Sequence, residues 1–167
     1  MSHLLLLRHA KSDWGDPGLT DHDRPLAPRG EQAAERMRAH LLASDLHPDL
    51  VLCSSSRRTR ETLDRLAPAF ADAEILIEDE LYGAGRTGLI ERLRAVSDEV
   101  GTVAVIGHNP GIQDLALDLA GTGDDLGRIQ EKYPAGALAV LEIDGPWRQL
   151  EPGAAQLVSF VKPRELG

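Results

Sequence analysis

The sequence predicts an α/β fold of three layers, in which a largely parallel central sheet is flanked by helices. Short apolar runs alternate with stretches of helical periodicity, the order typical of parallel strands joined by helices. Leu4–Leu7 is an unbroken apolar run, which indicates a strand buried on both faces. Aromatic residues make up only 4% of the chain, so Leu, Val, Ile and Ala are expected to build the core.

The first half of the chain is expected to hold strands at 4–7, 50–53 and 75–77, helices at 29–44 and 57–67, and a polar loop over 11–28. The helix at 29–44 follows from apolar side chains at the spacing of one helix face: Ala33, Ala34, Met37, Leu41 and Leu42. Three serines, Ser54 to Ser56, stand where a residue is needed to cap the helix at 57–67.

The second half is expected to hold strands at 102–106, 138–143 and 156–161 and helices at 88–97 and 112–120. The helix at 88–97 buries one apolar face made by Leu89, Ile90, Leu93 and Val96. Residues 121–136 are polar and weakly patterned, and we expect a loop there with a short helix at about 126–132.

Composition limits the class of protein. The 167 residues are 42% hydrophobic and 27% charged, which fits one globular domain over residues 1–167. The formal net charge of −9 argues against a nucleic-acid partner. Cys53 is the only cysteine, so the chain forms no internal disulfide. The first apolar run is too short for a membrane span or a signal peptide, and a cytoplasmic location is the default expectation; the oligomeric state is not set by the sequence.

Three predicted strands end in groups suited to a phosphoryl anion. Arg8 and His9 follow the first strand, Ser54 and Arg58 follow the second, and His108 follows the strand at 102–106. The carboxyl ends of parallel strands form the usual ligand-binding edge of an α/β sheet, and helix N-termini after the last two strands add unpaired N–H groups. Because the chain is acidic as a whole, these cations and imidazoles together predict a local anion site.

The motifs resemble those of the histidine phosphatase superfamily, whose fold is phosphoglycerate mutase-like. Arg8-His9-Ala10 is similar to the family's first histidine motif, Ser54 with Arg58 to its second basic element, and Gly107-His108-Asn109-Pro110 to its second histidine motif. Further segments resemble the SixA branch, whose named activity is phosphohistidine phosphatase: Lys11-Ser12-Asp13-Trp14, Asp21, Arg24-Pro25-Leu26, Arg29-Gly30 and Lys132-Tyr133-Pro134.

The chemistry of these residue types suggests their roles. A neutral imidazole is a nucleophile toward phosphorus, so His9 is expected to carry the phosphoryl group as a covalent intermediate. Arg8 and Arg58 stay charged and match phosphate oxygens with paired donors, and His108 adds a further donor. Ser54 either binds substrate or Arg8, or caps a helix. Asn109 is a candidate substrate contact, although a cap for the next helix is favoured.

Other polar residues near the motifs are expected to be structural. Asp21, Arg24 and Arg29 are interpreted as an ion-pair network that fixes the loop over 11–28. Arg57 precedes Arg58 on the same helix and is expected to face away from the pocket. The remaining histidines are expected on the surface, and none has a partner at the spacing of a metal site, so no metal or other cofactor is predicted: His3, His22, His40 and His47.

The sequence departs from the wider family at the general acid. Phosphomonoester branches resemble one another in a Leu-x-Glu element, whereas no glutamate lies two places after Leu81 here. Asp79, Glu80 and Asp13 are the remaining candidates. An imidazole leaves phosphorus with less need of a proton than an alkoxide does, so the departure favours a phosphoramidate substrate.

Four functions compete at this point. The resemblance favours a phosphatase that acts on phosphohistidine in a protein, and a small-molecule phosphomonoesterase of the same superfamily is the alternative, with a phosphorylated metabolite as substrate. A cysteine-dependent phosphatase is excluded, because its phosphate loop needs an arginine six places after the cysteine and Thr59 stands there. A phosphate-binding module without activity is disfavoured by the presence of all four core residues.

Overall fold

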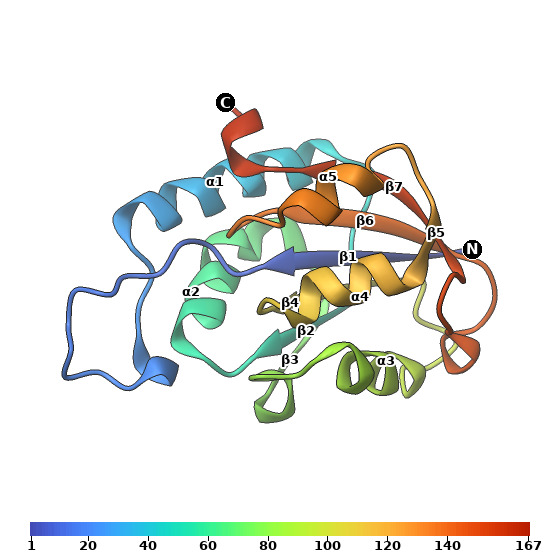
Figure 1. Cartoon of the computed structure of the whole chain (residues 1–167), viewed down its shortest axis with the longest axis horizontal. Helices are drawn as coiled ribbons and strands as arrows, with labels where there is room; N and C mark the ends of the chain where they lie inside the picture. Colours follow the sequence, from blue (N-terminus) through green and yellow to red (C-terminus); the bar gives the residue numbers. More distant parts are fainter.

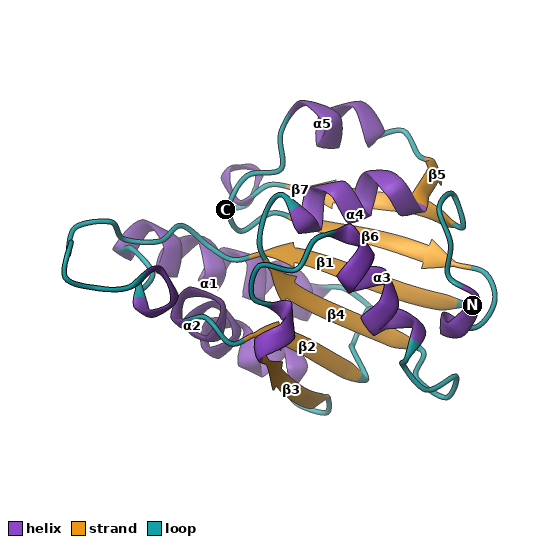
Figure 2. Ribbon diagram, turned by 60° about the horizontal axis from the view of Figure 1, so that its bottom comes forward, coloured by secondary structure: helices purple, strands orange, loops and turns teal.

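The computed structural model describes residues 1–167 and contains one mixed sheet of seven strands in the order β3-β2-β4-β1-β6-β7-β5 (Figures 1 and 2). The strands are β1 (Ser2–Arg8), β2 (Leu50–Ser54), β3 (Glu74–Glu78), β4 (Thr102–Gly107), β5 (Ala120–Thr122), β6 (Leu138–Ile143) and β7 (Ala155–Val161). The helices are α1 (Pro28–Ala43), α2 (Arg57–Leu66), α3 (Arg86–Arg94), α4 (Gly111–Leu119) and α5 (Leu126–Glu131).

Two kinds of pairing divide the sheet. β3, β2, β4 and β1 are parallel neighbours, whereas β6 runs antiparallel to both β1 and β7, and the short β5 pairs parallel to β7. The predicted α/β fold with a largely parallel sheet between helices is therefore confirmed. The parallel half brings the carboxyl ends of β1, β2 and β4 to one edge of the sheet.

The leucines of β1 show why both faces of the sheet are covered. Leu4 and Leu6 pack into one hydrophobic cluster, together with side chains of α3 and α4. Leu5 and Leu7 pack into a second cluster on the opposite face, with side chains of α1 and α2. All four leucines are at most 3% exposed, as an unbroken apolar run in a helix-covered strand requires. Figure 2 shows α1 and α2 on one side of the sheet and α3 and α4 on the other.

The chain leaves β1 along a path fixed by backbone hydrogen bonds. The His9 N–H donates to the Gly107 carbonyl of β4 at 3.0 Å, and the Gly136 N–H donates to the carbonyls of Arg8 and His9 at 3.0 and 2.9 Å. Gly136 has a φ of +80°, a conformation that favours glycine over residues with a side chain. The segment before β6 therefore holds Arg8 and His9 in place at the end of β1.

Some local predictions differ from the structure. Leu42 is 51% exposed, because α1 already buries Ala34, Met37 and Leu41 against the sheet. The serine that caps α2 is Ser56, whose hydroxyl accepts the Thr59 N–H, and α2 ends at Leu66 before a short 3-10 turn. β5 was not predicted, because three residues are too few for a periodic pattern. None of the helices combines the length and the apolar character needed to cross a lipid bilayer.

Candidate active site

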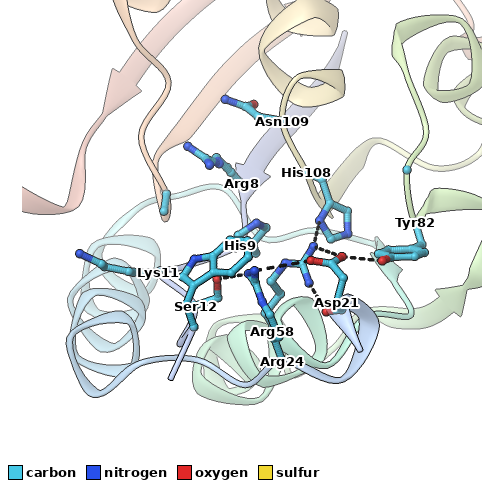
Figure 3. Close-up of a pocket in the computed structure, with 13 residues that line it drawn as sticks. Arg8, His9, Lys11, Ser12, Asp21, Arg24, Arg58, Tyr82, His108 and Asn109 are labelled. Atoms are coloured by element: carbon cyan, nitrogen blue, oxygen red, sulfur yellow. Dashed lines mark hydrogen bonds and ion pairs between the residues drawn. The ribbon is translucent and has the colours of Figure 1, made fainter. Parts of the chain in front are cut away.

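A pocket of about 440 Å³ lies at the carboxyl ends of β1, β2 and β4 (Figure 3). Residues from all three strand ends meet there, including the four predicted core residues. The lining comprises Arg8, His9, Lys11, Ser12, Trp14, Asp21, Arg24, Arg58, Tyr82, Gly83, His108, Asn109 and Ala135. The fold thus gathers into one cavity residues that lie more than a hundred positions apart in the sequence.

His9 is held in one tautomer. Its Nδ1 lies 2.7 Å from the Ala10 carbonyl oxygen, which only accepts hydrogen bonds, so Nδ1 carries the proton and Nε2 keeps its lone pair. The side chain is 8% exposed. Burial, reinforced by the charges of neighbouring cations, lowers the pKa of His9 to about 3. At neutral pH the ring is therefore uncharged, and Nε2 is free to act as a nucleophile.

His108 has the opposite tautomer. Its Nδ1 lies 3.4 Å from Nη2 of Arg58, and a guanidinium only donates, so the proton sits on Nε2 and points to Ser54 Oγ at 2.7 Å. Burial and then the charge of Arg58 lower the pKa of His108 to about 4. The ring centroids of His9 and His108 are 5.2 Å apart. Both rings are therefore neutral at pH 7.

Ser54 does not line the pocket, which corrects its predicted role as a direct substrate contact. The residue is fully buried at the end of β2, and its hydroxyl holds the Nε2 side of His108. Ser54 therefore positions His108, and its alternative role as the helix cap falls to Ser56. Asn109 does line the pocket, but its Oδ1 accepts the Gln113 N–H in the first turn of α4 and its Nδ2 donates to the Tyr133 carbonyl. These contacts match the favoured interpretation, in which Asn109 fixes the start of α4.

Three arginines give the pocket an excess of positive charge. Arg8 donates through Nη1 to the Tyr133 carbonyl at 2.9 Å, and Arg58 donates to the Asp21 carbonyl at 2.7 Å and to its carboxylate at 3.1 Å. Burial, followed by repulsion from Arg58, lowers the pKa of Arg8. Nitrogens of all three guanidiniums are buried without a hydrogen-bond partner, namely Arg8 Nε, Arg24 Nε and Nη1, and Arg58 Nε. Asp21 is the only carboxylate in the lining, so the pocket suits a multiply charged anion.

The predicted ion-pair network is correct only in part. Asp21 does pair with Arg24 at 3.5 Å, but its second partner is Arg58, and Arg29 makes no ion pair. Arg24 is 6% exposed, lines the pocket and lies over the ring of Trp14. Arg24 and Asp21 thus belong to the pocket itself. In the sequence, the only feature that linked Arg24 and Asp21 to the site was their place in the motif that follows the first strand.

Tyr82 was not predicted as part of the site. Its hydroxyl donates to the Asp21 carboxylate, and this hydrogen bond is the largest cause of the lowered pKa of Asp21. The ring lies edge-on to His108, with centroids 5.5 Å apart, and also to His22. Tyr82 follows Leu81, in the region where the phosphomonoester branches carry the glutamate of their Leu-x-Glu element. A single tyrosine forms no sequence motif, so nothing in the sequence predicted its place in the site.

None of the predicted acid candidates lines the pocket. Asp79 and Glu80 are exposed in a short turn after β3, and Asp13 accepts the Gly15 N–H at 2.7 Å. Arg57 faces away, as predicted, and pairs with Glu61 at 3.1 Å. No group of three or more His, Cys, Asp or Glu side chains is arranged to hold a metal ion.

Comparison with known proteins places this geometry in a family. Residues 4–83 match the model of the histidine phosphatase superfamily, branch 1. An uncharacterized protein of Mycobacterium tuberculosis is 44% identical over 162 residues, which cover 95% of this chain and all of that protein. A solved structure from Nakamurella multipartitia, named as a candidate phosphohistidine phosphatase SixA, has 32% identity and a TM-score of 0.84 over 97% of this chain and 96% of the other.

A second structure with the same candidate name, from Agrobacterium tumefaciens, has 30% identity and a TM-score of 0.84 and covers 97% of this chain and 98% of that one. The chain belongs to the histidine phosphatase superfamily, branch 1. Its phosphoglycerate mutase-like fold and its similarity to SixA structures agree with the resemblance drawn from the sequence motifs.

Proposed function

We propose that this protein is a phosphatase that removes the phosphoryl group from phosphohistidine in a protein, through a phosphohistidine intermediate on His9. One observation carries the proposal: the Nε2 lone pair of a neutral His9 is available in a pocket where three arginines, Arg8, Arg24 and Arg58, are opposed by only one carboxylate. A neutral nucleophile beside excess positive charge is the arrangement that phosphoryl transfer needs.

In the first step, His9 Nε2 forms a bond to phosphorus while the bond from phosphorus to the substrate's imidazole nitrogen breaks. The electron pair of the broken bond stays with the substrate nitrogen, and a ring protonated at its other nitrogen leaves as neutral imidazole. In the second step, water attacks phosphorus and loses a proton to solvent, and the bond to His9 Nε2 breaks. The products are inorganic phosphate and the original neutral His9.

The arginines stabilise the charge that spreads over the phosphoryl oxygens in both transition states. Arg8 and Arg58 are already fixed by bonds to the Tyr133 and Asp21 carbonyls, so little reorganisation accompanies the reaction. A bound dianion also raises the pKa of His108, because an opposite charge favours the protonated ring. Protonation at Nδ1 ends its role as an acceptor from Arg58 and makes His108 a further donor for the bound anion.

The lack of a pocket acid favours phosphohistidine over a phosphomonoester. An alkoxide leaving group needs a proton, and Asp21, the only carboxylate in the lining, has a lowered pKa and stays ionised. Its hydrogen bonds to Tyr82 and Arg58 further commit its oxygens as acceptors. A small-molecule phosphomonoesterase of the same superfamily is the competing function, and the protonated carboxylic acid that it would use is not in this lining.

The test compares kcat/KM for a histidine-phosphorylated peptide with values for phosphotyrosine, a sugar phosphate and a nucleotide. The proposal predicts the highest value for the phosphohistidine peptide, and a phosphoenzyme that survives alkaline quench but not acid. A higher kcat/KM for the sugar phosphate would establish the alternative. An intermediate located on a residue other than His9 would overturn the mechanism.

A further inference from the structure

A second basic cavity adjoins the pocket. It has a volume of about 610 Å³ and shares Lys11 and Ala135 with the pocket lining, so the two cavities are neighbours along the surface. We call this second cavity the basic groove. Its six cationic side chains come from four segments of the chain: Lys11, Arg29, Arg36, Lys132, Lys162 and Arg164. No acidic residue lines it.

The cations of the basic groove are not neutralised within the chain. None of the six takes part in an ion pair, whereas the arginines of α2, α3 and α5 include members of several ion pairs. The acidic residues on α1 are directed elsewhere, since Glu31 and Glu35 both pair with Arg65 of α2. In a chain of net charge −9, so many unpaired cations in one place indicate a binding site for negative charge.

Lys162 is the strongest sign that the groove is built to bind an anion. The residue is only 8% exposed, yet it lines the groove and forms no ion pair. The nearby carboxylate of Glu165 is engaged by Arg128, with contacts of 2.7 and 2.6 Å. Because Arg128 holds the Glu165 carboxylate, an anion in the groove would give Lys162 an ion-pair partner that the chain itself does not provide at short range.

The shape of the groove favours an extended ligand. Four groove residues lie along one face of α1: Arg29, Gln32, Ala33 and Arg36. The helix rises about 10 Å between the first and the last of them. α1 packs closely against the segment after β1. A Cβ at position 30 would lie only 2.1 Å from the Lys11 carbonyl oxygen, so glycine is needed there. Trp14 is 76% exposed at the rim of the pocket, and exposed aromatic residues are typical of surfaces that bind proteins.

We propose that the basic groove binds an acidic segment of the phosphorylated protein, next to the phosphohistidine that enters the pocket. This inference rests on the proposed function and deepens it by naming the chemistry of the substrate protein. Carboxylates on that segment pair with the groove cations while the phosphoryl group reaches His9. The groove thereby selects phosphohistidine with acidic residues near it.

The test uses two histidine-phosphorylated peptides of equal length, one with four glutamates beside the phosphohistidine and one with four glutamines. We expect kcat/KM for the glutamate peptide to be at least about fivefold higher at low salt, and the preference to fade near 0.5 M salt. The overall charge of −9 repels the glutamate peptide, so a preference for it must come from a local site. No preference at low salt would overturn the proposal.

The variant Arg29→Glu/Arg36→Glu reverses two groove charges and is expected to bring the ratio of the two kcat/KM values to one or below. Its matched control is Arg38→Glu/Arg86→Glu, which makes the same change in net charge at residues outside the groove and should keep the preference. Equal loss of preference in both double variants would assign the effect to net charge and overturn the proposal.

A binding measurement separates this proposal from the proposed function. Fluorescence anisotropy of the labelled, unphosphorylated glutamate peptide reports on the groove even if the protein hydrolyses neither phosphopeptide. Weaker binding to the groove variant than to its control supports the proposal. If the peptide does not bind and inorganic tripolyphosphate binds in a way that depends on Arg29 and Arg36, the groove serves a small polyanion and the proposal is wrong.

Discussion

The pocket and the basic groove are both positively charged regions of an acidic chain, but they hold their cations differently. In the pocket, Arg24 and Arg58 are 6% and 7% exposed, and their guanidiniums are tied to Ser12 and Asp21. In the groove, Arg29 and Arg36 are exposed and make no ion pair. Fixed, desolvated charge suits a transition state, whereas exposed, solvated charge suits the recognition of a partner.

The test with the largest expected effect removes His9, the proposed nucleophile. His9→Ala is expected to lower turnover by at least about a thousandfold, because the other neutral imidazole of the pocket, His108, has its lone pair on Nδ1 turned toward Arg58. The fold should persist, since His9 lies beyond the end of β1 and outside the hydrophobic clusters. Phosphate release and circular dichroism measure the two effects. Full activity in a folded His9→Ala protein would end the covalent mechanism.

The next test removes one fixed charge. Arg8→Ala and Arg58→Ala should each lower kcat/KM for free phosphohistidine by at least about a hundredfold, the usual effect of losing one preorganised donor. Arg38→Ala, which removes an equal charge from α1 outside both cavities, is the control and should change the rate by less than about twofold. If Arg38→Ala costs as much as Arg58→Ala, overall charge and not the fixed geometry governs the rate.

These two tests concern residues that the sequence made visible, and the reason is physical. Each of Arg8, His9, Arg58 and His108 lies at or soon after the end of a strand, and the end of an apolar run can be read without knowing the fold. The parallel topology then brings these strand ends together at one edge of the sheet. The α/β class and most element positions were predicted for the same reason, from apolar runs and helical periodicity.

What escaped prediction depends on loops and on pairing across the sheet. Arg24 and Asp21 enter the pocket because the segment over 11–28 turns back on itself, with Ser12 bridged to Leu26, and no local pattern fixes that path. The partners of Ser54 and Tyr82 are His108 and Asp21, which lie 54 and 61 positions away in the sequence. The groove cations come from separate segments, so their shared surface is set by packing alone.

Acid stability provides a third test, because the pocket buries two neutral histidines. Burial lowers the pKa of His9 to about 3 and of His108 to about 4, from an ordinary 6.5. Below pH 6.5 the unfolded chain therefore binds more protons than the folded chain, and the free energy of unfolding falls as the pH drops toward 4. At pH 5 each ring should account for about 2 kcal/mol of this loss.

Denaturant unfolding at pH 7 and pH 5 measures that loss, and the comparison of the wild type with His9→Asn and His108→Asn isolates the part due to each ring. Each variant should be less sensitive to acid than the wild type. His3→Asn, at a half-buried ring far from the pocket, is the control. Equal acid sensitivity in all four proteins would mean that the pocket histidines are solvated like ordinary surface groups.

A smaller effect is expected when the pocket loses its only carboxylate. Asp21→Asn keeps the backbone carbonyl that accepts from Arg58 but removes the negative charge that partly neutralises Arg24 and Arg58. The inhibition constant of inorganic phosphate should therefore fall about three- to tenfold, because more positive charge is left for the anion. Product inhibition assays measure it. Weaker phosphate binding would show that Asp21 serves mainly to position Arg58.

The smallest expected effect is that of a chelator. In the pocket, Arg8, Arg24 and Arg58 already supply the positive charge that a divalent ion would bring to phosphoryl oxygens, and they do so from fixed positions. Incubation with EDTA should therefore leave kcat/KM for a phosphohistidine peptide within error of the untreated protein. A loss of activity that added Mg²⁺ or Zn²⁺ restores would mean that the arginines do not suffice, and that the pocket, unlike the groove, needs a cation from outside the chain.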